Sequence, residues 1–347
     1  MGKKTALGIV FDQLQTVPPV ATADLQGKTV VVIGANTGLG FEAAKHFARM
    51  NAGRVILACR SKEKGEAAVA RLKEDTGYMK AELWIIDLSK FSSVKAFADR
   101  YEKEGGRLDI LVENAATMPA TDDNGDALLT EDGWETSFQV NNLALSLLAI
   151  LLLPRMIQTA KAHSTNPRLV VVASEVHFFT TLQPAVVNST NPLKTFGSKE
   201  YCTTSVLGSR YFDTKLMNVF FTRALSDRLG KSPVIVNCVN PGFCRSELRR
   251  DLFGVKLALV WAIEKLIART TEQGSRQLVW AAVGGEEDLD KLRGEYISLQ
   301  EVHEPSDYAL GEEGKVLQER LWENLIGELF TVDPRVKSIV QQLTSSS

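Results

Sequence analysis

Tyr211 and Lys215 stand four residues apart in the segment SRYFDTKLMN and could perform acid–base chemistry together. On a helix, two residues at this spacing project from one face. An ammonium beside a phenol favours the phenolate, and so lowers the phenol pKa from about 10 toward the range in which a catalytic acid works. Of the six tyrosines, Tyr211 alone has a lysine four residues later. Because such pairs also occur on ordinary helix surfaces, the interpretation depends on the rest of the chain.

The second chemical feature is a glycine-rich turn, Gly34–Gly40 (GANTGLG), that follows the apolar run Val30–Ile33. A strand, a glycine turn and then a helix is the context of a phosphate-binding loop. Glycine has no Cβ, so a pyrophosphate can approach the main chain, and the N-terminus of the helix expected at Phe41–Met50 offers unpaired N–H donors. The sequence therefore predicts a dinucleotide site here rather than an ordinary turn.

The residues after the next two strands indicate the cofactor type. An NAD site usually places Asp or Glu after the second strand, whereas an arginine suits the 2′-phosphate of NADP. Arg60 holds this position, and Ser61 and Lys62 add donors. NADP is therefore favoured over NAD, with a solvated loop arginine as the alternative. Asp87 ends the third strand and is expected to accept a hydrogen bond from the adenine amine, or else to cap a helix.

The elements that must position these residues alternate along the chain from Lys28 onward. We expect strands at residues 30–33, 54–59, 82–87, 108–113, 168–174, 234–239 and 295–299, and helices at 41–50, 62–76, 92–103, 132–160, 209–229 and 271–283. Apolar strands separated by helices indicate a parallel sheet covered on both faces. With the glycine turn after the first strand, the sequence predicts an α/β fold with a doubly wound parallel sheet, the Rossmann fold.

The chain is expected to form one domain over residues 28–330, which includes a C-terminal helical extension. Leucines recur every four residues over Leu317–Leu329, as on a helix that docks through one face. Residues 1–27 contain Pro18-Pro19 and are expected to be a loosely packed leader. Residues 331–347 are expected to be a tail.

Two segments are candidates for the walls of a substrate site. The apolar helix expected at 255–268 could be a core or oligomer-contact helix or a membrane-surface contact, but its place after the sixth strand favours a lid at about 243–270. The long connection 178–207 is of a length that is usually functional. A bulky lipophilic substrate is indicated by Phe178, Phe179, Leu182, Phe243 and Trp261.

Composition excludes several classes of protein. The formal net charge of −2 over 347 residues argues against a nucleic-acid binder. The four cysteines show no metal-ligand spacing with the histidines, so we expect no metal and a reducing, cytoplasmic compartment. The longest apolar run, Leu143–Leu153, is shorter than the ~20 residues that span a bilayer, so no integral membrane span is expected.

These residues, in this order, resemble the short-chain dehydrogenase/reductase family. GANTGLG is similar to the family's TGxxxGxG turn, with Ile33 in place of the threonine. LDILVENAA is similar to its NNAG segment, from which Glu113 and Ala116 depart. QVNNL, VVVASEVH, YFDTK and NPGFCRS match further motifs, and the resemblance covers about residues 28–330. ACRSKEKGE and GEEGKVLQERLWENL resemble the retinol-dehydrogenase-like branch, to which fungal biosynthetic reductases also belong.

The resemblance implies a catalytic tetrad of Asn141, Ser174, Tyr211 and Lys215. Tyr211 would give a proton to the substrate carbonyl oxygen as hydride arrives from the nicotinamide, and Ser174 would hydrogen-bond that oxygen. Lys215 would hold the nicotinamide ribose, and Asn141 would position a water that relays the proton. The implied cofactor-binding residues are Gly34, Asn36, Thr37, Gly38, Leu39, Gly40, Arg60, Asp87, Leu88, Asn114, Ala115, Tyr211, Lys215, Pro241 and Gly242.

The predicted function is an NADPH-dependent ketoreductase, or the reverse alcohol dehydrogenase, for a lipophilic ketone or aldehyde, with a role in secondary metabolism indicated by the branch alone. The alternatives are an NADP-binding sensor or scaffold with an idle tetrad, and an epimerase or dehydratase of the same fold. His177 follows Ser174 but no GxSxG elbow surrounds the serine, which disfavours a hydrolase. A homodimer through Leu143–Leu153 and the helix starting at Ser209 is conceivable, unless the C-terminal extension covers that surface.

Overall fold

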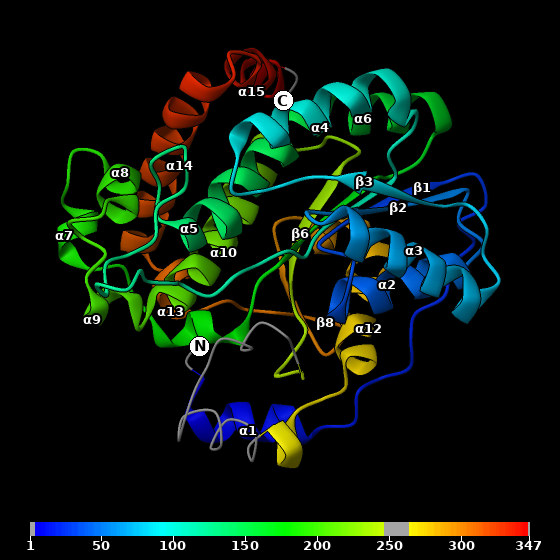
Figure 1. The fold of residues 1–347 in the computed structure, drawn as a ribbon, viewed down its shortest axis with the longest axis horizontal. Coiled ribbons are helices and arrows are strands. Elements are labelled where there is room, and N and C mark those ends of the chain that lie inside the picture. Colours follow the sequence, from blue (N-terminus) through cyan, green and yellow to red (C-terminus); the bar gives the residue numbers. More distant parts are fainter. Residues whose placement is uncertain (1–3, 246–263, 346–347) are drawn as a thin grey trace.

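A single sheet organises residues 4–245 and 264–345, the part of the chain that this computed structural model describes. Within it the eight strands follow the order β3-β2-β1-β4-β5-β6-β7-β8 (Figure 1). Neighbours are parallel except β8, which pairs antiparallel with β7. The strands are β1 (Thr29–Ile33), β2 (Arg54–Cys59), β3 (Ala81–Ile85), β4 (Ile110–Glu113), β5 (Arg168–Val172), β6 (Ile235–Asn240), β7 (Tyr296–Ser298) and β8 (Glu301–His303). The doubly wound parallel sheet is confirmed, and β8 is an addition to it.

Helices cover both faces of the sheet (Figure 1). One face carries α2 (Gly38–Arg49), α3 (Lys62–Thr76) and α12 (Thr271–Val283), and the other carries α4 (Phe91–Arg100), α6 (Ala144–His163) and α10 (Arg210–Leu229). Along β1, Val30 and Val32 belong to the first of these cores, and Val31 and Ile33 to the second. Two covered faces explain why the central strands are apolar at most consecutive positions rather than at alternate ones, as in TVVVI of β1.

The long helix expected at 132–160 is interrupted. It is built as α5 (Thr136–Phe138), the π-helical segment η2 (Gln139–Leu143) and then α6. Asp132 lies outside it, and its carboxylate accepts hydrogen bonds from the Phe91 N–H and the Gln139 side chain. Among the described residues, Thr136–His163 is the one helical run with the length and composition to cross a membrane, and 78% of its most apolar stretch is buried inside the fold.

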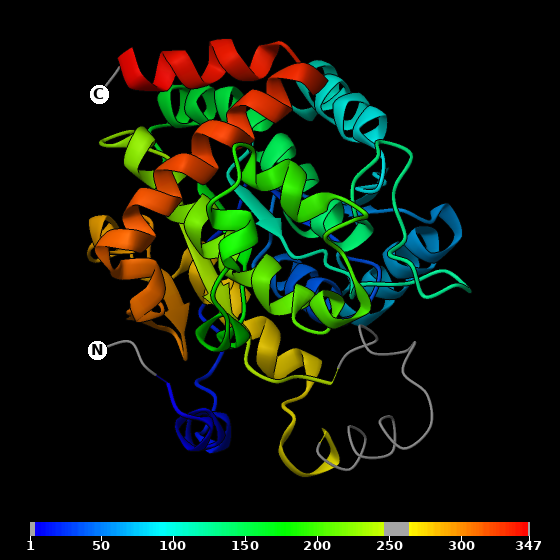
Figure 2. The same cartoon turned by 90° about the vertical axis from the view of Figure 1, so that its left-hand side faces the viewer.

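The C-terminal extension packs against the two longest helices of the second face (Figure 2). It consists of α13 (Asp307–Leu310), α14 (Glu312–Val332) and α15 (Arg335–Ser345). Trp322 of α14 stacks on Phe221 of α10, and α15 packs against α6. The segment expected as a tail is therefore largely helical, because Val336 and Leu343 are buried in the same core. The extension therefore packs on α6 and α10, the two helices through which the sequence would allow a homodimer.

The leader and the long connection also contain structure that the sequence pattern did not predict. The leader forms α1 (Ala6–Leu14), which contacts the chain beyond β6 through a buried Gln13. The connection contains η3 (Glu175–Phe179), α7 (Pro184–Val187), α8 (Pro192–Gly197) and α9 (Thr204–Leu207). Leu182 belongs to the core rather than to a site wall, because it is buried among core side chains. Most of the expected 255–268 helix, including Trp261, lies outside the described residues.

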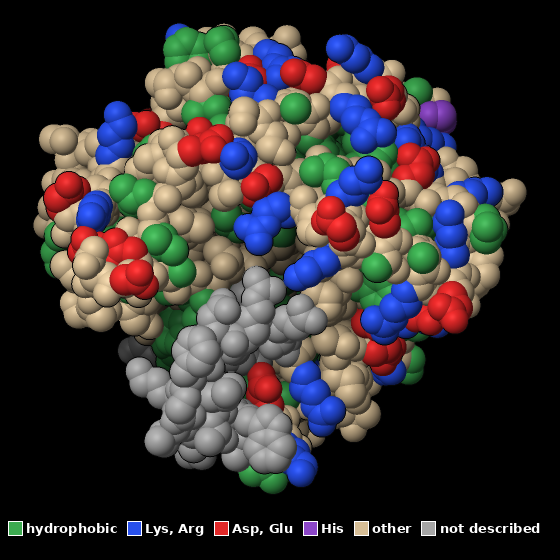
Figure 3. Space-filling model, in the orientation of Figure 1, with side chains coloured by type: hydrophobic (Ala, Val, Ile, Leu, Met, Phe, Trp, Pro, Cys, Tyr) green, Lys and Arg blue, Asp and Glu red, His purple; other side chains and the backbone are tan. Residues whose placement is uncertain are grey.

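The surface is mixed in charge. On the face drawn in Figure 3, Lys and Arg side chains are interspersed with Asp and Glu, in keeping with the formal net charge of −2. The four cysteines are buried and free. Short helical segments η1 (Tyr101–Gly105) and η5 (Leu289–Leu292) complete the described elements.

Candidate active site

The glycine turn lies at the end of β1, where β2 pairs on one side and β4 on the other. Gly34 and Gly38 have φ of +78° and +63°, which favour glycine. A Cβ on Gly40 would lie 2.4 Å from the Gly34 carbonyl oxygen, so only glycine fits. The Asn114 side chain donates to that carbonyl at 3.0 Å and fastens the end of β4 to the turn. Because α2 begins at Gly38, three residues earlier than expected, its first N–H groups belong to the turn itself.

The predicted adenosine residues lie at the same edge. Arg60 directly follows β2 and is exposed, and the Ser61 hydroxyl is already engaged as the cap of α3, where it accepts from the Lys64 N–H. Asp87 follows β3 and accepts from both the N–H and the hydroxyl of Ser89. The alternative role of Asp87 as a helix cap is wrong, because α4 begins at Phe91 after Lys90.

Tyr211 and Lys215 lie in the first turns of α10, beside the end of β5. The Lys215 ammonium nitrogen Nζ is 5.5 Å from the centre of the Tyr211 ring and donates to the Val172 carbonyl at 2.7 Å. Burial lowers the pKa of Lys215 to about 7. Ser174 lies two residues beyond Val172, at the start of η3, and its Oγ accepts from the Val176 N–H. Lys215 thus ties the tyrosine helix to the strand end that carries the serine.

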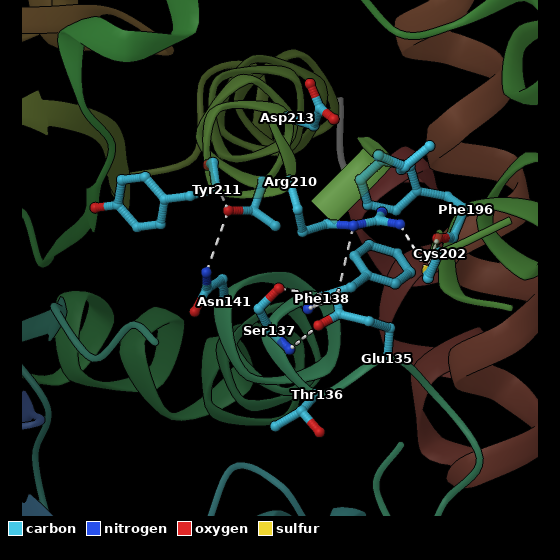
Figure 4. A network of polar contacts seen from close by, with 12 residues as sticks. Glu135, Thr136, Ser137, Phe138, Asn141, Phe196, Cys202, Arg210, Tyr211 and Asp213 are labelled. Carbon is cyan, nitrogen blue, oxygen red and sulfur yellow. Dashed lines mark hydrogen bonds and ion pairs between the residues drawn. The ribbon is translucent and has the colours of Figure 1, made fainter. Parts of the chain in front are cut away.

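Asn141 lies in η2 with its side chain buried and hydrogen-bonded through both of its polar atoms. Its Oδ1 accepts from the Thr117 N–H at 2.8 Å, and its Nδ2 donates to the Thr117 carbonyl and to Thr214 Oγ1. Thr214 stands between the tyrosine and the lysine in the sequence of α10, and Figure 4 shows Asn141 beside this helix. The amide therefore joins the loop after β4 to the tyrosine helix. Its predicted role in holding a water stays a prediction.

A buried charge network on the other side of α10 was not predicted from the sequence. Arg210 and Tyr211 point to opposite sides of the helix (Figure 4). The Arg210 guanidinium donates to Cys202 Sγ at 2.7 Å, lies 3.7 Å from the centre of the Phe196 ring, and its Nε is 3.7 Å from a carboxylate oxygen of Glu135. The Glu135 carboxylate also caps the start of α5. The network fixes α10 against the helical run that carries Asn141. The one sequence signal for it is an arginine, Arg210, directly before the tyrosine.

The proline–glycine turn after β6 closes the site with help from the leader. Gly242 has a φ of +80°, and a Cβ there would lie 2.5 Å from Arg269 Nη1. Gln13 of α1 accepts from the Phe243 N–H at 2.9 Å and donates to the Phe243 and Ile267 carbonyls at 2.7 Å. Asn240 Oδ1 accepts from Gly242 and from Glu175. A leader expected to pack loosely therefore contributes to the site.

Glu113, a departure from the family's NNAG segment, is a buried acid. It ends β4 next to Asn114 and is 1% exposed. Among the described residues, neither carboxyl oxygen has a hydrogen-bond partner. Burial raises the pKa of this carboxyl well above its usual value, which favours its neutral, protonated form in the folded chain.

Comparisons with known proteins agree with this architecture. Residues 28–184 match the model of the short chain dehydrogenase family. The chain is 35% identical to a short chain dehydrogenase/reductase, dmxR8, of Cryptosporiopsis sp. (96% of this chain, 99% of the relative). It is also 35% identical to retinol dehydrogenase 12 of Mus musculus, over 90% of each chain. The structure of L-sorbose reductase from Gluconobacter frateurii complexed with NADPH and L-sorbose has the same fold (20% identity, TM-score 0.56, 80% of this chain and 97% of that one).

The chain belongs to the short-chain dehydrogenase/reductase family of oxidoreductases, in its retinol-dehydrogenase-like branch.

Proposed function

We propose that this protein transfers a hydride between NADP(H) and a lipophilic ketone or aldehyde, or the corresponding alcohol. The observation that carries the proposal is that Lys215 joins the Tyr211 helix to the end of β5, two residues before Ser174, at the same edge of the parallel sheet as the glycine turn. The buried Lys215 has no carboxylate partner among the described residues and donates to a backbone carbonyl next to the tyrosine ring. Family members use such groups to reduce carbonyls or oxidise alcohols.

The chain's residues divide the work as follows. Bound NADPH would supply the hydride. Tyr211 Oη would donate the proton that the carbonyl oxygen receives, and Ser174 Oγ would stabilise the charge that develops on that oxygen. Lys215, with a pKa of about 7, would contribute positive charge at neutral pH and below, and would hold the nicotinamide ribose. Asn141 would hold the water that returns the proton.

The binding of a dinucleotide is supported by the steric fit of the glycine turn, and the preference for NADP over NAD is supported by Arg60. Gly34, Gly38 and Gly40 leave a cradle that a Cβ would obstruct at Gly40, as an approaching pyrophosphate requires. Arg60 is exposed at the end of β2, within reach of a 2′-phosphate in this fold. A member of the same fold, L-sorbose reductase, is complexed with NADPH. A lipophilic substrate, a role in secondary metabolism and a cytoplasmic location stay predictions.

The test is oxidation of NADPH and of NADH by the purified protein with a panel of bulky ketones and aldehydes. We expect turnover with NADPH, a loss of about 10²–10⁴-fold in Tyr211→Phe, and a shift toward NADH in Arg60→Asp. Tyr308→Phe, in the C-terminal extension, is the matched control and should keep full turnover. Binding of NADPH without its oxidation by any carbonyl would contradict the reductase. Binding of neither cofactor would contradict the dinucleotide site.

A further inference from the structure

His177 lies three residues after Ser174 and is completely buried. Its Nδ1 is 2.6 Å from the Ser174 carbonyl oxygen, and its Nε2 is 3.2 Å from the Ser306 main-chain nitrogen. A carbonyl can only accept and a main-chain N–H can only donate. The two neighbours therefore set the tautomer: Nδ1 carries the proton and Nε2 accepts.

The surroundings keep this ring neutral and immobile. It lies 4.1 Å from the Phe178 ring and 4.8 Å from the Tyr296 ring, centre to centre. Burial lowers the pKa of His177 to about 4, so the neutral form that can donate and accept at once persists at physiological pH. Tyr296 belongs to β7 and Ser306 precedes α13, so the imidazole joins the turn after β5 to the C-terminal part of the chain.

The contact reaches the main chain of a proposed catalytic residue. Besides His177 Nδ1, the Ser174 carbonyl accepts only the longer bond from the His177 N–H, at 3.3 Å, among the described residues. The Ser174 hydroxyl makes a 3.4 Å contact with the Val176 N–H, which by itself holds it weakly. The hydrogen bond from the imidazole is therefore the shortest of these contacts, and it holds the main chain of Ser174.

We propose that His177 is a positioning residue for the reaction: its imidazole, held in the Nδ1–H tautomer by Ser306, orients Ser174 so that Oγ faces the substrate oxygen. The inference rests on the proposed function, because it assigns Ser174 a role in turnover. A serine displaced by about 1 Å loses on the order of 100-fold in rate, while binding of the cofactor at the glycine turn is untouched.

Three substitutions separate the two hydrogen bonds. His177→Phe keeps an aromatic ring and removes both bonds. His177→Asn places an amide N–H close to the Nδ1 position and can still donate to the Ser174 carbonyl. His177→Gln reaches the Nε2 position and can accept from Ser306, but it loses the bond to the serine. Ser306→Ala is the control, because it keeps the N–H and removes a hydroxyl that has no partner among the described residues.

We expect kcat to fall by about 10–100-fold in His177→Phe and His177→Gln, with KM and NADPH affinity within about threefold of the parent. His177→Asn should recover most of kcat even if its melting temperature is as low as that of the other two. Rates that follow the melting temperatures, or equal rates in the Asn and Gln variants, would overturn the positioning role.

Nitrogen NMR of the histidine rings gives a readout that needs no turnover. We expect one neutral ring in the Nδ1–H form that does not titrate between pH 8 and about 5, and that disappears in His177→Phe. If the signal that His177→Phe removes came from a ring protonated at Nε2, the inference would be overturned even in an active enzyme. A parent protein without turnover on any carbonyl would defeat the proposed function and the inference with it, whereas an active parent matched by His177→Phe would defeat the inference alone.

Discussion

The cofactor side and the substrate side of this site are built in different ways. On the cofactor side, the ends of β1, β2 and β4 are aligned by a main-chain hydrogen-bond ladder, and the glycine turn fits closely against them with the Asn114 side chain as its fastening. On the substrate side, single side chains hold loops together over long sequence separations. Gln13 bonds a carbonyl 254 residues away, and His177 a main-chain N–H 129 residues away.

The two sides differ in what positions their residues: main-chain hydrogen bonds on the cofactor side, and individual side-chain contacts on the substrate side. A ladder fixes many groups at once, so we expect the fold of the cofactor side to be more sensitive to an added atom at Gly40 than to the loss of a single side chain. The substrate side has few contacts per loop, and each of them is specific. The loops can therefore diverge without disturbing the sheet, which is how one fold accommodates many substrates.

The largest effect is expected at Arg210, where the substrate side depends on a buried charge. Arg210→Leu leaves the buried carboxylate of Glu135 without its cation and should lower the free energy of unfolding by about 3–5 kcal/mol. Lys315→Leu, which breaks an exposed pair with Glu312, should cost less than about 1 kcal/mol. Denaturant unfolding measures both. A decrease in the free energy of unfolding of less than about 1 kcal/mol for Arg210→Leu would mean that the Arg210–Glu135 pair does not stabilise the substrate side.

Gly40→Ala tests the cofactor side by adding one atom. The new Cβ meets the Gly34 carbonyl and the Asn114 amide, so overpacking should cost about 1–3 kcal/mol and weaken NADPH binding more than tenfold. At Gly38 a Cβ meets nothing within 4 Å and only the φ of +63° is strained. Gly38→Ala should therefore disturb binding less. Fluorescence titration with NADPH ranks the two variants, and the reverse ranking would contradict the steric account.

Glu113→Gln is expected to stabilise the cofactor side in a pH-dependent way. The folded pKa of this carboxyl lies above its unfolded value near 4.5, so its contribution to stability is complete below that value and is lost as pH rises toward the folded pKa. The glutamine variant never ionises. Its free energy of unfolding should be about 1–2 kcal/mol higher than that of the parent at pH 8, and equal to it near pH 4. Equal stability at both pH values would indicate that the carboxyl reaches a partner or solvent.

The smallest effect is expected at Gln13. Gln13→Leu removes three hydrogen bonds to Phe243 and Ile267, and we expect the free energy of unfolding in denaturant to fall by about 1 kcal/mol, together with faster tryptic cleavage after Arg245 and Arg269. Gln15→Leu, an exposed position one residue beyond α1, should leave the cleavage rate unchanged. Unaltered cleavage in Gln13→Leu would show that α1 does not restrain the chain at Phe243 and Ile267.

The same contrast decides what sequence reasoning could predict. The strands, the glycine turn and the Tyr211–Lys215 spacing are local patterns, so the sheet was predictable, and the structure does bring these residues together. The contacts of Gln13, Arg210 and Ser306 join positions far apart in sequence, and no local pattern marks them. The π turn at Asn141 also escaped, because a single extra residue in a helix hardly alters its apolar periodicity. The catalytic roles of the tetrad stay predictions.

The contact between His177 and Ser306 has a consequence for biosynthesis. At about 5–20 residues per second, a ribosome adds the 129 residues that separate the two roughly 6–26 s after it adds His177. By then β1–β6 and the helix of Tyr211 have been translated. A nascent chain released from the tunnel up to β6 thus contains every element of the cofactor side, yet the imidazole beside Ser174 still lacks its donor. If His177 positions the serine as proposed, we expect Ser174 to be the last of the four predicted tetrad residues to reach its final position. A chain truncated before residue 306 would lack the main-chain donor to His177 altogether.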